Sequence, residues 1–170
     1  MSTVSAILRS YRAPREVIRT HRAGGADEAT GLTWLFVACI LFFVAELPEL
    51  SRQAHFAQLE GVETPFSSLA LPTFYGTVLL APLMFVLLAG LAQLVARAAG
   101  GQGRWLDGRL AMFWSLLCVS PVVLLQGLVG GFIGAGPGLT FVSLLVFVVF
   151  LYLWLNCLIA LNAKEKAEPV

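Results

Sequence analysis

The chain has 170 residues, of which 58% are hydrophobic and 12% charged, and its mean hydropathy is +0.84. This composition excludes a water-soluble globular domain, and a formal net charge of +1 provides no overall field that would attract a nucleic acid. The cysteines Cys39, Cys118 and Cys157 lie in apolar stretches without a CxxC or Cys/His pattern. We therefore expect buried thiols rather than a disulfide or a metal site.

Residues 1–30 form a basic segment in which apolar and basic positions recur at helical spacing. Pro14 is tolerated in the first turn of a helix, so two short helices joined near Ala13 are predicted. We expect an amphipathic interfacial helix in the plane of the lipid headgroups, rather than a nucleic-acid patch or a disordered tail, because the apolar face must be buried somewhere. This face consists of Val4, Ile7, Leu8 and Tyr11, and its basic flank of Arg9, Arg12, Arg15, Arg19 and Arg22.

Two long stretches, residues 64–96 and 110–163, contain no charged residue. The second has 54 residues, and as one helix it would be roughly 80 Å long against a hydrocarbon core of about 30 Å, so it must fold back. The sequence predicts an all-α polytopic membrane domain over residues 31–163, with a charged tail at 164–170. Four transmembrane helices are expected at about residues 32–49, 71–96, 110–129 and 139–162, with a hairpin at 130–138. A fifth, partly inserted segment within residues 50–70 remains open.

The basic residues determine the expected orientation. Five lie before the first span, three (Arg97, Arg104 and Arg109) between the second and third, and two in the tail, whereas the loop after the first span has one and the hairpin none. Lysine and arginine concentrate in cytoplasmic loops. Both termini and the segment around Arg104 are therefore predicted to be cytoplasmic.

Glu46, Glu49, Arg52 and His55 follow one another at steps of three, which would stack them on one helix face. One interpretation is a proton or cation site formed by Glu46 and Glu49, because ionisable groups at membrane depth tend to be functional. The favoured interpretation is a headgroup-level cluster in which Glu49 pairs with Arg52. The sequence contains no nucleophile–base pair or HExxH motif, so neither an enzyme nor a cofactor is predicted.

Polar and small residues within the spans predict helix packing. Gln93, Gln126 and Asn156 are expected to form hydrogen bonds between helices. The small residues Gly76, Gly90 and Ala92 are expected to let neighbouring helices approach closely. Gly127, Gly130, Gly131, Gly134 and Gly138 also give GxxxG spacings. We interpret these spacings as a tight turn rather than as a helix dimerisation face.

The segment Ala99-Gly-Gly-Gln-Gly-Arg-Trp-Leu-Asp-Gly-Arg109, followed by Ser120-Pro121 in an apolar helix, resembles the bacterial branch of the Yip (Ypt-interacting protein) family. Ala13-Pro-Arg-Glu-Val-Ile-Arg19 is similar to the Pro-Arg element that these proteins carry before their first span. The resemblance implies a multi-span helical domain without known catalysis, commonly with five spans. Eukaryotic members bind small Rab-type GTPases and shape or sort membranes, but none of their binding residues maps onto this chain.

Taken together, these patterns predict a non-enzymatic scaffold or membrane-organising accessory subunit of a bacterial inner membrane. The expected partners are anionic lipids at Arg9, Arg12, Arg15 and Arg19, and lipid or a partner protein at Arg104, Trp105 and Arg109. A membrane-protein partner and a homo-oligomer both remain open. The alternative is a small transporter or channel that uses Glu46 and Glu49 near the outer face.

Overall fold

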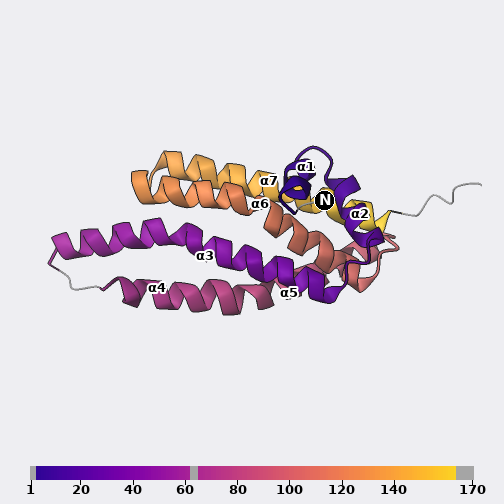
Figure 1. Ribbon diagram of the computed structural model, residues 1–170, viewed down its shortest axis with the longest axis horizontal. Helices are drawn as coiled ribbons and strands as arrows, with labels where there is room; N and C mark the ends of the chain where they lie inside the picture. Colours follow the sequence, from indigo (N-terminus) through magenta and orange to yellow (C-terminus); the bar gives the residue numbers. More distant parts are fainter. Residues whose placement is uncertain (1–2, 62–64, 164–170) are drawn as a thin grey trace, which may run out of the picture.

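The computed structural model describes residues 3–61 and 65–163, and its regular elements are all helices (Figure 1). Two short helices, α1 (Thr3–Ser10) and α2 (Pro14–Ala23), precede the long helix α3 (Glu28–Leu59). Helix α4 (Phe66–Phe74), the π-helical segment η1 (Tyr75–Leu80) and α5 (Ala81–Ala98) follow without a break. The hairpin of α6 (Trp105–Ile133) and α7 (Pro137–Asn162) completes the chain. The predicted charged tail and Glu63 lie outside the described residues.

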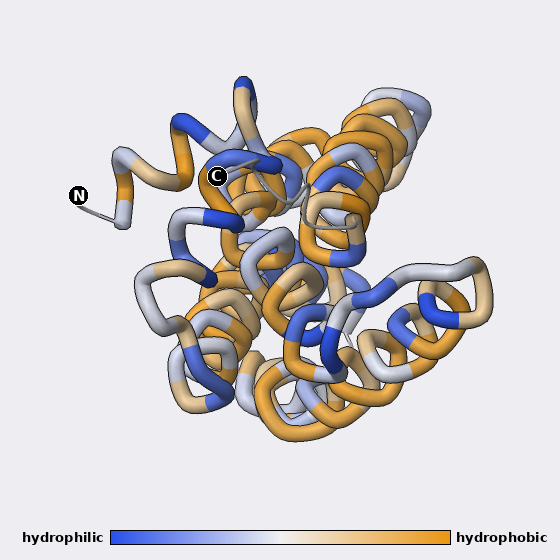
Figure 2. The backbone as a smooth tube through the Cα atoms, turned by 90° about the vertical axis from the view of Figure 1, so that its right-hand side faces the viewer, coloured by the Kyte–Doolittle hydropathy of each residue, from blue (hydrophilic) through white to orange (hydrophobic). Residues whose placement is uncertain are grey.

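Four helical stretches of the described chain are long and apolar enough to cross a membrane: 28–59, 66–98, 105–133 and 137–162. The predicted polytopic helical membrane protein is thereby confirmed, and the described residues hold no fifth stretch of this kind. Figure 2, an end-on view, shows hydrophobic residues around the long helices rather than only between them. Many large apolar side chains are exposed, including Leu87 at 66% and Phe141 at 69%, as expected for helices surrounded by lipid.

The helices extend beyond several predicted boundaries. Helix α3 passes through Pro48 to Leu59, because a proline in an apolar helix can be accommodated by packing neighbours. Helix α6 continues to Ile133, so the predicted hairpin at 130–138 is wrong in extent. The turn is confined to Gly134–Gly136, and Gly134 has a φ of +78°, a conformation that favours glycine.

Helix α6 is the central helix of the bundle. Every residue from Leu110 to Ser120 is buried, which a helix achieves only when neighbours cover it on all sides. Helices α3, α5 and α7 pack against this half, and the short helices α1 and α2 close the remaining side (Figure 1). The N-terminal segment is therefore part of the packed bundle, not only a surface attachment.

The GxxxG glycines Gly127 and Gly131 lie where α6 approaches α3 closely. A methyl group at Gly127 would overlap the backbone of Ala45, and one at Gly131 would overlap Pro48. The predicted turn role is thus wrong for this pair, which lies within a helix and allows two backbones to approach. By contrast, nothing lies within 4 Å of a methyl group built on Gly76 or Gly90, so their predicted packing role is also wrong.

Helices α4, η1 and α5 run beside α3 as one almost continuous rod (Figure 1). Segment η1 lies between Pro72 of α4 and Pro82 at the start of α5. Proline removes a backbone donor and disfavours regular hydrogen bonding, which explains a change of helix type between the two. The rod packs against α3 along its length, and its main contact with α6 is made by α5.

Candidate functional site

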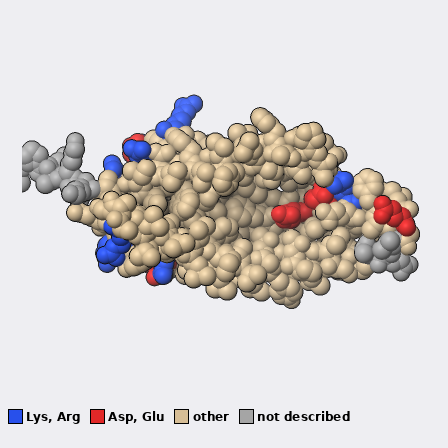
Figure 3. Space-filling model, turned by 180° about the vertical axis from the view of Figure 1, so that it is seen from behind, with Lys and Arg blue, Asp and Glu red and all other residues tan. Residues whose placement is uncertain are grey.

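The charged residues of the described chain separate into two ends of the bundle (Figure 3). We call the end that carries α1, α2 and the α5–α6 connection the basic end, and the end that carries the last two turns of α3 the acidic end. The basic end begins at Asn156 of α7, and the acidic end begins at Gly134 of the α6–α7 turn. Asn156 lies 19 positions after Pro137 in α7, a helical rise of roughly 29 Å, which matches the hydrocarbon core of a bilayer.

Asp107 anchors the N-terminal segment at the basic end. Its carboxylate accepts a hydrogen bond from Nε of Arg22 at 2.7 Å and from the backbone N–H of Arg104, the residue before α6, at 2.6 Å. The Asp107 side chain is 8% exposed. One buried carboxylate therefore both caps α6 and holds α2 against it.

A cluster of three aromatic rings fills the space between α2, α3 and α6. The His21 ring lies 4.4 Å from the Trp114 ring and 5.2 Å from the Trp34 ring, and the two indoles are 4.8 Å apart. Burial in this cluster lowers the pKa of His21, because desolvation disfavours the imidazolium. The Trp114 Nε1–H donates to Oγ of Ser10 at 3.0 Å, which joins α1 to the same cluster.

The residue after α1, Tyr11, also contacts the central helix α6. The Tyr11 hydroxyl donates to the Cys118 carbonyl at 2.5 Å, and burial raises the pKa of this phenol. Of the predicted apolar face, Ile7 and Tyr11 are half-buried against the bundle, whereas Val4 and Leu8 are 67% and 66% exposed. The exposed pair leaves an apolar edge on α1 beside the membrane-spanning helices.

The predicted arginines of the N-terminal segment have different roles. Arg15 donates to Oδ1 of Asn156 at 2.8 Å, and Arg19 to the Ala160 carbonyl at 3.3 Å, so both hold α2 on α7. Arg9 pairs with Glu16 of α2. Arg12 is exposed and forms no ion pair with any described residue. Within this group, Arg12 is the side chain most available to a ligand.

The other predicted contact residues lie around the α5–α6 connection. Arg104 is exposed, and Trp105 is 50% exposed with the Arg97 guanidinium 5.4 Å from its ring centroid. Arg109 instead pairs with Glu28 at the start of α3. A cation–aromatic pair and an exposed arginine are thus both present at the surface of the basic end.

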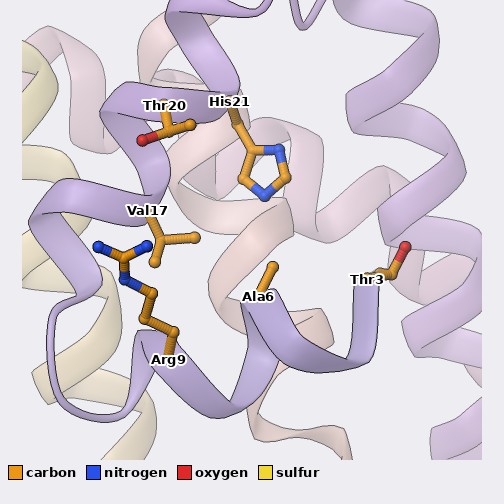
Figure 4. A pocket seen from close by; sticks show the side chains of 6 residues that line it. All are labelled: Thr3, Ala6, Arg9, Val17, Thr20 and His21. Carbon is orange, nitrogen blue, oxygen red and sulfur yellow. The ribbon is translucent and has the colours of Figure 1, made fainter. Parts of the chain in front are cut away.

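A pocket of about 310 Å³ lies between α1 and α2 (Figure 4). Its lining includes the apolar residues Ala6 and Val17 together with Arg9 and His21. The threonines Thr3 and Thr20 complete the lining. The pocket combines apolar side chains with one cation and polar side chains at the basic end.

A buried amide pair closes the basic end between α5 and α7. Gln93 is fully buried and exchanges hydrogen bonds with Asn162 at 2.9 and 3.1 Å. Gln93 also donates to the Gly103 carbonyl, and Asn162 accepts from the Gly103 N–H. The predicted helix-to-helix hydrogen bonds of Gln93, Gln126 and Asn156 are confirmed, with Ser143 as the partner of Gln126 at 2.8 Å.

At the acidic end, Glu49 and Arg52 form the expected pair. The guanidinium binds both carboxylate oxygens at 2.7 and 3.0 Å, and Gln53 donates to the same carboxylate at 3.1 Å. A Cβ at Gly134 would lie 2.6 Å from Nη1 of Arg52, so the pair sits directly on the α6–α7 turn. Glu49 therefore holds Arg52 against the α6–α7 turn and has a structural role.

Glu46 does not join this pair. Its side chain is exposed, and it has no hydrogen-bond or ion-pair partner among the described residues. Leu35 and Cys39 lie on the same face of α3 as Glu46 and are 0% exposed. This face is therefore covered by neighbouring helices toward the basic end and exposed toward the acidic end. Figure 3 shows acidic side chains in and beside a hollow on this face of the molecule.

Several of these residues were missed in the sequence. Asp107 stands three residues after Arg104 at the start of an apolar helix, which is a capping position that could have been recognised. His21 and Asn162 carry no comparable signal, because their partners lie on other helices. The free, buried cysteines are confirmed for Cys39, Cys118 and Cys157. The described residues contain no group of three or more potential metal ligands.

No family model, no curated protein and no solved structure matches this chain. Its membrane character therefore follows from its own four apolar helices, and its function must be argued from its own residues.

Proposed function

We propose that this integral membrane protein is a non-enzymatic scaffold or membrane-organising accessory subunit that works through its basic end. The observation that carries the proposal is the exposed cationic surface formed by Arg12, Arg104 and the Arg97–Trp105 pair. Arginines at a membrane boundary attract anionic headgroups, and exposed Trp and Arg side chains are common at protein interfaces. The exposed apolar residues Val4 and Leu8 support the same role, since they can enter the headgroup boundary.

The proposed location is a bacterial inner membrane with both termini in the cytoplasm. The excess of basic residues at one end supports this orientation through the positive-inside rule. A place in the bacterial branch of the Yip family remains part of the proposal, on the motifs of residues 13–19 and 99–109. The proposal includes no GTPase partner.

Anionic-lipid retention provides the first test. The full chain is reconstituted in vesicles of phosphatidylglycerol and phosphatidylethanolamine and extracted gently, and native mass spectrometry counts the retained lipids. Arg12→Glu combined with Arg104→Glu should reduce retained phosphatidylglycerol several-fold, because each arginine near an anionic surface contributes about 1 kcal/mol. Gln58→Glu, an exposed acidic-end change, is the control. Unchanged retention in the double variant would contradict the lipid-binding role.

The accessory role has its own test, which is the recovery of the tagged chain from native membranes. A single partner present in stoichiometric amount is the expected result. A homo-oligomer with no other component would contradict the accessory role and favour the second candidate.

The second candidate is a small transporter or channel, and it is favoured by Glu46, which is exposed and has no partner in the part of the chain that the structure describes. Glu49 is less suitable for ion transfer, because Arg52 and Gln53 already occupy its carboxylate. This function requires proton- or cation-dependent flux in proteoliposomes that Glu46→Gln abolishes and Glu60→Gln preserves.

A further inference from the structure

Glu46 points into the angle between two neighbouring helices. Ala45 and Pro48 of α3 contact α6, whereas Phe43 contacts Phe74 of α4 with ring centroids 5.2 Å apart. At 100° per residue, Glu46 lies between these two contact directions. Its carboxyl group therefore faces the gap between the α4–η1 rod and α6, above the surface of α3.

This gap is a cleft that opens toward the acidic end. In the half of the bundle nearer the basic end, α5 packs against α6 and the facing residues Leu35 and Cys39 of α3 are fully buried. Nearer the acidic end, α4 and η1 pack mainly on α3 and form no comparable contact with α6, and the α3 face that contains Leu35 and Cys39 becomes exposed at Glu46. The hollow visible in Figure 3 agrees with this description.

With the hydrocarbon core placed between Pro137 and Asn156 of α7, Glu46 falls inside it. Arg52 lies beside Gly134 and marks the boundary of the hydrocarbon core at the acidic end. Glu46 comes six residues before Arg52, which is roughly 9 Å along the helix. A carboxyl group at this depth is costly unless it is paired. Because Ala45 contacts Gly127, Glu46 lies at the same level as its neighbour Gln126, which is hydrogen-bonded to Ser143.

We propose that the cleft at Glu46 binds a transmembrane helix of another membrane protein, one that carries a lysine or arginine at the depth of Glu46. This inference rests on the proposed accessory role and names the chemistry of the partner. The basic side chain of the partner would neutralise the Glu46 carboxylate. The other N–H donors of that side chain would lie at the level of the Gln126–Ser143 pair. Polar contacts of this kind drive helix association in lipid, where apolar surfaces alone provide little driving force.

Charge complementarity separates this occupant from the others. A lipid chain has no hydrogen-bond donor at this depth, and a headgroup amine would lie roughly 9 Å further out. In a second copy of this chain, the only described lysine or arginine of the acidic end is Arg52, which is already bound to Glu49. The cleft also does not suit an ion path, because the buried apolar residues Leu35 and Cys39 block this face of α3 toward the basic end.

A synthetic helix provides the test. The probe is a single-span oligoleucine peptide with one lysine six residues from its acidic-end boundary, and matched peptides carry leucine or glutamate there. Association with the full chain in vesicles is measured by energy transfer between labelled peptide and protein. The wild type should bind the lysine peptide about tenfold more tightly than the leucine peptide. Moving the lysine to the other end of the probe should remove this preference.

Two variants identify the residue responsible. Glu46→Gln should abolish the preference for lysine, and Glu46→Lys should transfer it to the glutamate peptide. Glu60→Gln, a change at the exposed end of α3, should leave the preference unchanged. Circular dichroism and thermal unfolding show whether each variant is folded. The gain of binding to the glutamate peptide expected for Glu46→Lys is a result that misfolding cannot produce.

Equal binding of the lysine and leucine peptides by the wild type would overturn the inference. Cation or proton flux that depends on Glu46 would also overturn it and assign the cleft to permeation. The retention of anionic lipid reports on the opposite end of the molecule, so the two proposals can fail separately. Loss of peptide preference with intact lipid retention would remove only the helix-binding site.

Discussion

Asp107 of α6 and Arg22 of α2 are 85 residues apart in the chain and are joined by a hydrogen-bonded ion pair of 2.7 Å. The second carboxylate oxygen of Asp107 accepts from the backbone N–H of Arg104. One side chain therefore links the packing of the N-terminal helices to the start of the central helix.

Asp107→Ala should lower the free energy of unfolding in detergent by about 2–3 kcal/mol, because it leaves the half-buried Arg22 unpaired and removes a helix cap. The comparison is Glu28→Ala, which removes the exposed pair with Arg109 and should cost less than about 1 kcal/mol. Denaturant titration measures both values. Similar losses in the two variants would show that Asp107 holds no special place in the bundle.

Gly127→Ala should destabilise the bundle by about 1–3 kcal/mol, since the added methyl group overlaps the Ala45 backbone and must push α3 away from α6. The same substitution at Gly90 is the matched control, because nothing lies within 4 Å of the new methyl group. Replacing a glycine within a helix by alanine should stabilise the protein there by about 0.5–1 kcal/mol. Thermal unfolding of the two variants should thus shift in opposite directions.

The thermal stability should fall as the pH decreases below about 6.5. His21 has a lowered pKa in the folded protein, so the folded state binds this proton less readily than the unfolded state. The stabilisation from neutral His21 is present above the unfolded pKa and is lost as the pH falls through the folded one. His21→Phe should weaken the pH dependence between pH 8 and 5, whereas His55→Gln, a change on the exposed face of α3, should preserve it.

Asn162→Ala should cost about 1–3 kcal/mol, because the fully buried Gln93 amide loses its main partner. Gln93→Met removes the stranded polar group while keeping a similar volume. The double variant should therefore be less destabilised than the sum of the single changes, and chemical denaturation of all four proteins gives the coupling energy. Additive losses would mean that the two amides act independently.

The cleft at Glu46 illustrates the limit of prediction from the sequence. The step-of-three pattern correctly identified the Glu49–Arg52 pair, since both residues lie on one helix. The pattern could not separate Glu46 from that pair, because the surroundings of Glu46 depend on where the rod of α4, η1 and α5 diverges from α6. The GxxxG pattern was misinterpreted for a similar reason, as its partner surface on α3 is about 80 residues away.

The sequence by itself determined the helical class, the four membrane-crossing stretches, the burial of the cysteines and the placement of charge along the chain. These properties follow from local hydropathy and length, which the thickness of a bilayer translates directly into structure. Only the tertiary structure decided that α6 is central, that α1 and α2 complete its burial, and that Glu46 faces an open cleft. In a membrane, lipid-facing and protein-facing surfaces are both apolar, so hydropathy cannot show which side of a helix meets its neighbour.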